Sequence, residues 1–477
     1  MKKTVLTSFA IFCLLSTAFL TGFKYSIKAS PTLIRVPEDY EKIQWAVSNA
    51  SDGGTIYVSS GTYHEHVVVD KSVSLVGEDR ETTIIDGNGE GIVVFICASG
   101  ASVSNFTIQQ SGGGGPPVGC GIFLSHSNDI MIFGNKIVNN AGSGIHSVAS
   151  NSCVIEQNII RSNTHNSHYQ VAGIYLLDLK GTMIYGNHIE NNADGVYLSH
   201  SHYNTLEENY LINNGISIYL SGSRNNNVAN NSVVNSFRGI CLWESCNNNK
   251  LINNMIADST WHNLLIYSSQ NCVIIENNFT NGHYGIEITD ELRNPPRFDN
   301  NSIYHNCFVN NEVQAAISES VNIWDNGAEG NYWSDYKGTD DDGDGVGDVP
   351  YGIDKYNQDN CPLMTCYIPP QEMQVSWVLY GKLLEKYNGL LVNYKDLFYN
   401  IYKNLNITYD NLQADYNSLD STYNNLSAIY NELKSKQEAT TSELSNIRNL
   451  MYIFVTTTII LAATTAYVAL RKPKIKN

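Results

Sequence analysis

Short runs of apolar, β-branched and aromatic residues recur along the chain and alternate with Asn, Gly and Ser. The phrase Gly-Ile-Phe-Leu begins at Gly121, and closely similar phrases begin at Gly173 and Gly195. Asparagines recur with steps of 23, 29, 22, 22, 23 and 24 residues, at Asn135, Asn158, Asn187, Asn209, Asn231, Asn254 and Asn278. A period of this length indicates stacked supersecondary units, each too small to bury its own apolar face. Because the apolar runs are short and rich in Ile, Val and Tyr, each unit is predicted to consist of strands and turns.

This repeat predicts an all-β fold, a right-handed parallel β-helix over residues 91–330. In Gly-Ile-x-Leu the alternation along a strand sends Ile and Leu inward and x outward. The expected core pairs are Ile122/Leu124, Ile174/Leu176, Val196/Leu198, Ile218/Leu220, Ile240/Leu242, Leu264/Ile266 and Ile286/Ile288. The asparagines are expected at tight turns, in a left-handed conformation, with their amides bonded to the asparagines of the coils above and below.

Residues 30–90 are expected to form an N-terminal cap and the first coils. Ile43, Ala46, Val47 and Ala50 lie at helical spacing, with Pro37 suited to the helix start. Such a helix would cover the open end of the β-helix, which otherwise exposes a strand edge. Residues 1–29 have a basic start and a long apolar run, which predicts a secretory signal peptide, with an uncleaved anchor as the alternative.

Residues 371–449 have a different pattern, in which Tyr-x-x-Leu repeats every seven residues. The repeat contains Tyr402/Leu405, Tyr409/Leu412, Tyr416/Leu419, Tyr423/Leu426 and Tyr430/Leu433. With Tyr at a and Leu at d, these heptads predict an α-helical coiled-coil stalk and therefore a homo-oligomer.

Residues 450–470 contain no charged side chain and match one transmembrane helix. The basic tail 471–477 is expected on the cytoplasmic side. The β-helix is therefore predicted to be extracellular or periplasmic, on a single-pass membrane protein.

The chain is acidic, with 29 basic against 46 acidic residues and a formal net charge of -17. This balance, without basic runs, argues against a nucleic-acid partner. Of the ten cysteines, Cys361 and Cys366 are the expected disulfide pair, and most of the others are expected to be buried as small hydrophobic residues.

The chain resembles a known family in three places: Ile84-Ile85-Asp86-Gly87, the Gly-Ile-x-Leu coils, and the closing Gly330-Asn331-Tyr332-Trp333-Ser334-Asp335-Tyr336. Together these resemble the NosD-type β-helix family of the pectin-lyase-like superfamily, over about residues 33–365. The resemblance implies an envelope protein and raises copper handling as one function. The histidines of Ser199-His200-Ser201-His202 point to the same strand face, and no Cys or Met pair completes a soft site, so copper is not expected.

Residues 331–370 are expected to close the β-helix and contain an acidic Asp/Gly loop. Oxygen ligands at alternate positions suit Ca²⁺, and the expected ligands are Asp340, Asp342, Asp344, Asp348 and the carbonyl of Val346. The twelfth position is Tyr351 rather than Glu, so Asp354 or another acid would have to supply a bidentate ligand. A solvated acidic turn is the alternative.

The outward position of the repeat forms an aromatic stripe of Phe123, Tyr175, Tyr197 and Tyr219, to which the row two residues further adds Trp243 and Tyr267. Ring faces offer flat apolar surfaces for sugars, which predicts glycan binding. The alternative is that the rings only stack on one another to stabilise parallel strands.

Catalysis on this scaffold would need clustered carboxylates, or acids with a basic residue. The acids of the repeats are scattered, and Asp178 with Asp194 is the pair that the pattern offers. We therefore expect a non-catalytic, surface-anchored β-helix for glycan binding, adhesion or envelope structure. A polysaccharide lyase or glycoside hydrolase, or a copper-handling accessory protein, is the alternative.

Overall fold

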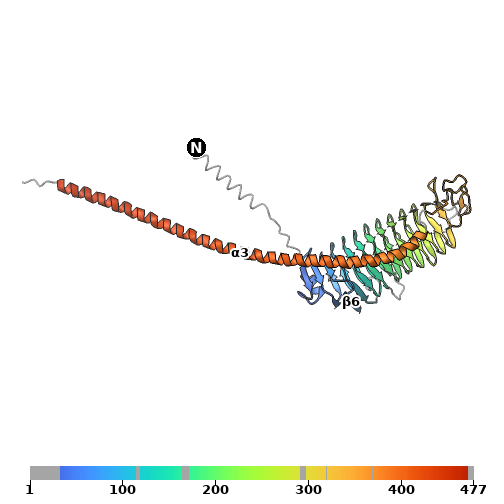
Figure 1. Cartoon of the computed structure of the whole chain (residues 1–477), viewed down its shortest axis with the longest axis horizontal. Helices are drawn as coiled ribbons and strands as arrows, with labels where there is room; N and C mark the ends of the chain where they lie inside the picture. The colour runs from blue at the N-terminus through green and yellow to red at the C-terminus, as the bar shows by residue number, and fades with distance from the viewer. Residues whose placement is uncertain are drawn as a thin grey trace, which may run out of the picture. The chain divides into compact units, whose positions relative to one another are not determined.

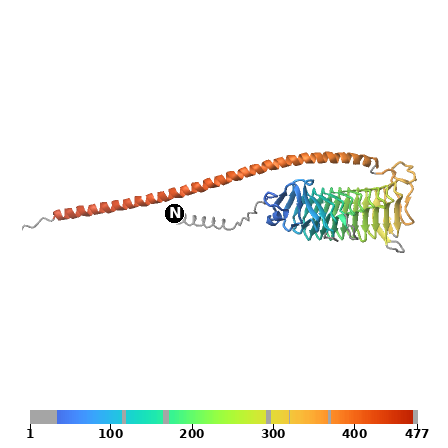
Figure 2. The same cartoon turned by 90° about the horizontal axis from the view of Figure 1, so that it is seen from below.

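The computed structural model describes residues 33–113, 119–163, 171–290, 297–318, 320–366 and 370–470. The predicted signal peptide and basic tail lie outside the described residues. The chain divides into two compact units, Met1–Pro369 and Pro370–Asn477. The first unit is a stack of short strands that runs from blue to yellow along the chain (Figure 1), and Figure 2 shows the same stack from below. The second unit contains one long helix, α3 (Pro370–Leu470).

Three parallel sheets form the first unit. Sheet A has 13 strands, in order along the stack β1 (Leu33–Val36), β2 (Thr55–Val58), β5 (Ser74–Gly77), β8 (Ser102–Ser104), β11 (Met131–Phe133), β14 (Val154–Glu156), β17 (Met183–Tyr185), β20 (Thr205–Glu207), β23 (Asn227–Ala229), β26 (Lys250–Ile252), β29 (Val273–Ile275), β32 (Arg297–Tyr304) and β35 (Ser320–Ile323). Sheet B has 12 strands: β3 (Gly61–His64), β6 (Thr83–Glu90), β9 (Thr107–Ser111), β12 (Lys136–Val138), β15 (Ile159–Arg161), β18 (His188–Glu190), β21 (Tyr210–Ile212), β24 (Ser232–Val234), β27 (Met255–Ala257), β30 (Asn278–Thr280), β33 (Cys307–Val309) and β36 (Tyr332–Trp333).

Sheet C has 11 strands: β4 (Val67–Val69), β7 (Val94–Ile96), β10 (Ile122–Ser125), β13 (Ile145–Val148), β16 (Ala172–Leu177), β19 (Asp194–Ser199), β22 (Ile216–Ser221), β25 (Arg238–Trp243), β28 (His262–Tyr267), β31 (Tyr284–Thr289) and β34 (Val313–Ser318). In the repeats each coil passes from sheet C to sheet A to sheet B and back. A separate antiparallel pair, β37 (Tyr351–Gly352) and β38 (Gln358–Asp359), lies near the end of the unit. The predicted parallel β-helix is confirmed.

The core is the row of Ile, Leu and Val side chains inside the coils. All seven predicted pairs are buried, each side chain at most 1% exposed. Burying a side chain of this size stabilises the fold by about 1.5–3 kcal/mol. The prediction of the core is therefore confirmed, and the residue between each pair faces outward.

A ladder of buried asparagines runs along the turn between sheets A and B. From Asn135 each Nδ2 donates to Oδ1 of the next coil over 2.9–3.2 Å, through Asn158, Asn187, Asn209, Asn231, Asn254, Asn277, Asn306 and Asn331. The prediction that Asn278 belongs to this ladder is wrong. Asn278 lies in β30 opposite Met255, and its neighbour Asn277 is the ladder residue of this coil.

The expected left-handed conformation is also misplaced by one residue. It falls on the residue before each ladder asparagine from Asn135 to Asn306, as at Gly134 (φ 65°) and Glu276 (φ 59°). This residue turns the chain, so the asparagine side chain can point inward and its Nδ2 can also reach a carbonyl of the preceding coil.

Helix α2 (Ile43–Asn49) contacts β1, β2 and β4 and buries Ile43, Ala46 and Val47. It begins at Ile43 rather than at Pro37, which follows a cis peptide bond and begins a turn. The helix has no side-chain cap of its own at Lys42. Instead the Glu65 carboxylate accepts the N–H groups of Ile43 and Gln44, both over 3.0 Å, and so satisfies donors that a helix start leaves without partners.

A disulfide joins Cys307 of β33 to Cys366, with 5.5 Å between their Cα atoms. The predicted Cys361–Cys366 pair is therefore wrong. Tyr332 lies opposite both Cys307 and Leu363, so the chain after Leu363 returns past β33 and brings Cys366 to Cys307. The free cysteines Cys120, Cys153, Cys241, Cys246 and Cys272 are buried, as expected for small hydrophobic residues.

Helix α3 is the part of the described chain that is long and apolar enough to cross a membrane. In its apolar part the hydroxyls of Thr456, Thr457 and Thr464 donate to carbonyls three and four residues earlier, and that of Thr458 donates to the carbonyl four residues earlier. Before the apolar part the heptad side chains Leu412, Tyr416, Leu419, Tyr423, Leu426, Tyr430 and Leu433 are all more than 60% exposed.

Candidate functional site

The aromatic column on the outer face of sheet C lies where the repeat predicts it. The strand register places Phe123, His146, Tyr175, Tyr197 and Tyr219 directly above one another. Tyr197 stacks between Tyr175 and Tyr219, with ring centroids 4.9 Å and 4.5 Å away. Burial raises the pKa of Tyr175 and of Tyr219.

Most of this column is closed to a ligand. Phe123 is 9% exposed, Tyr175 8% and Tyr197 3%, so their ring faces are covered by one another and by their surroundings. For these three residues the described geometry is the stacking arrangement. Tyr219 is half-buried and ends the row of rings, since the column continues with Cys241 and Leu265.

Trp243 and Tyr267 belong to a different column, in register with Ser221 and two residues further along the strands. Their rings stack with centroids 4.3 Å apart and an interplanar angle of 18°. Both side chains are half-buried. The predicted stripe is therefore two separate groups of rings, and only Tyr219, Trp243 and Tyr267 reach the surface.

The acids Asp178 and Asp194 are not brought together. Asp194 starts β19 opposite Ala172, whereas Asp178 follows Leu177 at the other end of β16. At about 3.3 Å per strand residue their backbones are roughly 20 Å apart. Asp194 is nevertheless unusual, because burial raises its pKa to about 6 while the Ile216 N–H donates to its Oδ1 over 2.9 Å.

Three polar side chains on the same face form a hydrogen-bonded chain, which we call the polar chain, and none of them is among the predicted site residues. Arg238 Nε donates to His262 Nδ1 over 3.2 Å, and His262 Nε2 hydrogen-bonds the Glu287 carboxylate. The His262 side chain is only 3% exposed and that of Glu287 is 31% exposed. Burial, together with the nearby Arg238 cation, lowers the pKa of His262 to about 4, and burial raises the pKa of Glu287.

The sequence repeat contains a signal for this hydrogen-bonded Arg238–His262–Glu287 group. The two residues before each outward-facing motif read Ala193-Asp194, Gly215-Ile216, Phe237-Arg238, Trp261-His262 and His283-Tyr284 in successive coils. Aligning these positions, rather than only the x of Gly-Ile-x-Leu, places aromatic, basic and imidazole groups on three neighbouring coils.

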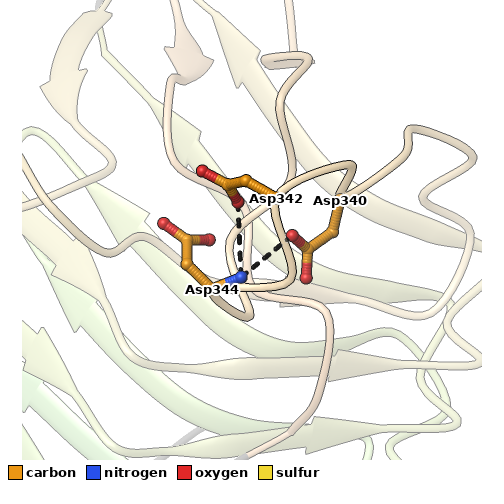
Figure 3. Close-up of side chains that lie close together, drawn as sticks. All are labelled: Asp340, Asp342 and Asp344. Carbon is orange, nitrogen blue, oxygen red and sulfur yellow. Dashed lines mark hydrogen bonds between the residues drawn. The ribbon is translucent and has the colours of Figure 1, made fainter.

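The acidic loop brings the side chains of Asp340, Asp342 and Asp344 together, with ligand oxygens within 4.8 Å of one another. Figure 3 shows the Asp344 N–H donating to both Asp340 and Asp342. Asp348 does not belong to this group, and its Oδ2 accepts the Asp341 N–H over 2.7 Å. Three clustered carboxylates are ligands that Ca²⁺ accepts.

The two other residues considered as ligands of this loop, Asp354 and Tyr351, bond other partners. Asp354 accepts bonds from the side chain and backbone of Asn357. The Tyr351 hydroxyl donates to Asp335 over 3.1 Å. Neither residue therefore supplies a bidentate ligand in this conformation.

Two family models match the chain. The model described as a right-handed β-helix region matches residues 90–256. The model described as periplasmic copper-binding protein (NosD) matches residues 233–338. The fold thus defines a right-handed parallel β-helix protein. Residues 233–338 of this β-helix are similar to the NosD family, as the closing motif and the coils predict.

Two curated relatives match a short part of the chain. A probable ABC transporter binding protein NosD of Stutzerimonas stutzeri is 34% identical over 100 residues, which is 21% of this chain and 22% of that protein. Its counterpart in Pseudomonas aeruginosa is 36% identical over 98 residues, 20% of this chain and 22% of that protein. The chain thus spans about a fifth of the length of these relatives.

Solved structures with related architecture are more distant. The A-module of a mannuronan C-5 epimerase of Azotobacter vinelandii has 16% identity and a TM-score of 0.45, covering 59% of this chain and 94% of that one. The catalytic domain of a GH87 α-1,3-glucanase has 13% identity and a TM-score of 0.47, covering 63% and 69%. An exopolygalacturonase of Thermotoga maritima has 13% identity and a TM-score of 0.41, covering 57% and 84%.

Proposed function

We propose that this chain is a membrane-anchored envelope protein whose β-helix binds a glycan on the outer face of sheet C without cleaving it. The observation that carries the proposal is the half-buried Trp243–Tyr267 stack, whose rings lie 4.3 Å apart on adjacent coils. Stacked, rigid rings at a surface provide apolar area at low entropic cost, and sugar ring faces pack well on them. Tyr219 adds a third ring on the preceding coil.

A binding role without cleavage is supported by the spacing of the acids. Asp194 on β19 and Glu287 on β31 are the outward carboxylates of this face whose pKa values are raised. Four coils separate their strands, which corresponds to roughly 19 Å at about 4.8 Å per coil. A glycosidase pair needs a separation of about 5–9.5 Å. A lyase or hydrolase remains the alternative that the experiment below tests.

In the proposed arrangement the anchor is the apolar end of α3, and the basic tail stays in the cytoplasm. The β-helix then lies outside the membrane, in agreement with the periplasmic description of the matching family model. The heptads of α3 form a coiled-coil stalk with a second copy, and residues 1–29 act as a secretory signal peptide. Helix α2 caps the first coils.

Calcium enters the proposal as a structural ion of the acidic loop. Asp340, Asp342 and Asp344 would hold it, with the Val346 carbonyl and a rotated Asp348 as further oxygen ligands. The ion would neutralise three neighbouring carboxylates that otherwise repel one another.

Copper is left out of the proposed function. The family description names it, but His262, His283 and His305 hydrogen-bond the carboxylates of Glu287, Glu312 and Glu329. Within the described residues, the cluster of three or more His, Cys, Asp or Glu ligands that could hold a metal is Asp340, Asp342 and Asp344, and hard carboxylate oxygens do not favour copper. A copper titration of the purified protein tests this choice.

The test uses the full chain in nanodiscs, with polysaccharides of different classes and calcium in the buffer. Trp243→Ala and Tyr267→Ala should weaken binding, while Tyr203→Ala, which removes an exposed ring elsewhere, should not. Chain length and unsaturation of the glycan are measured after incubation. Binding with an intact glycan supports the proposal, whereas shortened or unsaturated products would establish an enzyme.

A further inference from the structure

Three aromatic side chains, two exposed and one half-buried, form a row at the turn that leads from sheet B into sheet C. Phe237 is 49% exposed and Trp261 is 42% exposed. The Trp261 N–H donates to the Phe237 carbonyl over 2.9 Å, so these residues lie on adjacent coils. On the next coil the His283 ring lies 4.7 Å from the Trp261 ring. We call Phe237, Trp261 and His283 the corner row.

The polar chain of sheet C borders the corner row directly, because the following residue of each coil is Arg238, His262 or Tyr284. The Arg238 guanidinium lies 5.1 Å from the centre of the Phe237 ring. Tyr284 stacks on His262 at 5.2 Å and also contacts His283 at 4.5 Å. Since His262 is buried and bonded on both ring nitrogens, the edge of the row is fixed before any ligand arrives.

The groups around the row suit hydroxyls better than charges. Arg238 brings N–H donors, of which Nε–H bonds His262, and Tyr284 brings a hydroxyl. Glu287 and Glu312 bring carboxylate acceptors, and the Glu312 side chain is 73% exposed where it bonds His283 over 2.6 Å. A sugar hydroxyl both donates and accepts, so this mixture can satisfy it.

The charged side chains beside the corner row disfavour a charged polysaccharide. Arg238 interacts electrostatically with Glu287, and Asp194 lies on the same face two coils from Arg238. Glu312 adds a further acid where it bonds His283. An acidic polysaccharide would bring its carboxylates against these acids, in a protein of net charge -17. A cationic chain would meet Arg238 at the edge of the row.

We propose that the corner row and its polar border bind an uncharged polysaccharide, whose sugar rings pack on Phe237 and Trp261 and whose hydroxyls bond Arg238, Glu287 and Glu312. This inference rests on the proposed function, because it assumes that sheet C meets a glycan. It adds a second contact region at the opposite end of β25 and β28 from Trp243 and Tyr267. It also names the class of glycan.

The test measures binding of the full chain in nanodiscs to an uncharged glucan, to polygalacturonate and to chitosan by isothermal titration calorimetry. Phe237→Ala and Trp261→Ala are the test variants. Trp45→Ala is the matched control, because Trp45 is 48% exposed on α2, outside sheet C. All three side chains are half exposed, so their truncation leaves the core intact, and circular dichroism checks that the fold is unchanged.

The expected result is binding of the glucan alone, weakened about tenfold in Phe237→Ala and Trp261→Ala and unchanged in Trp45→Ala. Binding of polygalacturonate or chitosan in place of the glucan would overturn the inferred class. Glucan binding that is lost in Tyr267→Ala but unchanged in both corner variants would overturn the corner site and keep the proposed function. Loss in the corner variants alone would support the corner site and overturn the role of Trp243 and Tyr267.

Discussion

The backbone N–H of Asn331 donates to Oδ2 of Asp359 over 2.7 Å, and this bond ends the asparagine ladder of the β-helix. The same oxygen accepts the Trp333 Nε1–H over 2.9 Å, and Oδ1 accepts the Cys361 N–H. An ionised carboxylate only accepts hydrogen bonds. Asp359 therefore satisfies the last coil without presenting a donor that would need a further coil.

The first prediction concerns this end of the ladder. Asp359→Ala should lower the stability of the β-helix by about 3 kcal/mol, because it leaves the buried N–H groups of Asn331 and Trp333 without partners. Asp359→Asn keeps one acceptor oxygen and should lose less. Urea unfolding followed by circular dichroism measures both. Equal stability of wild type and Asp359→Ala would contradict this role.

The second prediction is a pH dependence caused by Asp194. Burial raises the pKa of this carboxyl to about 6 in the folded chain from its ordinary value of 3.8. The folded state therefore favours the protonated form, so the contribution of Asp194 to stability is greatest below about pH 4 and is lost as the pH rises through 6. Over this range the wild type should lose up to about 3 kcal/mol relative to Asp194→Asn, which does not ionise.

Unfolding midpoints of the two proteins, measured from pH 4 to pH 7, check this prediction. Asparagine can still accept the Ile216 N–H, so the variant isolates the charge from the hydrogen bond. Parallel curves for the two proteins would show that Asp194 does not titrate in this range.

The third prediction concerns the disulfide at the end of the β-helix. Cys307→Ser should lower stability by about 2–4 kcal/mol, since the bond closes a loop between residues 59 apart in sequence. Cys361→Ser should change little, because Cys361 carries a free thiol. Peptide mapping under non-reducing conditions identifies the pair directly, and a Cys361–Cys366 peptide would contradict the structure.

The fourth prediction concerns the exposed heptad seam of α3. Leu419→Asp and Leu426→Asp should separate the proposed oligomer, because a charge at position d cannot be buried against a partner helix. Ser421→Asp, at the outward f position, is the control. Cross-linking in nanodiscs reports the copy number, and a monomeric wild type would refute the coiled-coil stalk.

The fifth prediction concerns calcium. Asp342→Asn removes one of the three clustered carboxylates and should abolish heat-detected Ca²⁺ binding, whereas Asp354→Asn should leave it unchanged because Asp354 bonds Asn357. Calcium should also raise the unfolding temperature of the wild type but not of Asp342→Asn. A wild type that shows no calcium signal would favour the solvated acidic turn.

Local alternation predicts the β-helix and its core because each Gly-Ile-x-Leu strand carries its own inward and outward pattern. It does not distinguish Asn277 from Asn278, since both are asparagines and only the turn decides which one points inward. The Cys307–Cys366 bond depends on how the chain returns after Leu363, and no local spacing contains that path.

The candidate site was predictable to a similar degree. The register of Tyr175, Tyr197 and Tyr219 follows from the repeat, but their burial depends on the surroundings of the finished sheet. Asp178 and Asp194 form a predicted pair because both lie near the tyrosine stripe in the repeat, but they occupy opposite ends of their strands. The Arg238–His262–Glu287 chain becomes visible in the sequence only when the two residues before each Gly-Ile-x-Leu motif are aligned, and these positions lie outside the most regular part of the motif.

The threonines in the apolar part of α3 bear on whether a membrane span formed by this helix needs a partner helix. The hydroxyls of Thr456, Thr457 and Thr458 donate to carbonyls of their own helix, so lipid can surround them without leaving a polar hydrogen unbonded. The span then needs no neighbouring helix for its own hydroxyls. In the proposed coiled coil, recruitment of a second copy would fall to the aqueous heptads. A protease that cuts between the two segments would then release the β-helix together with its stalk.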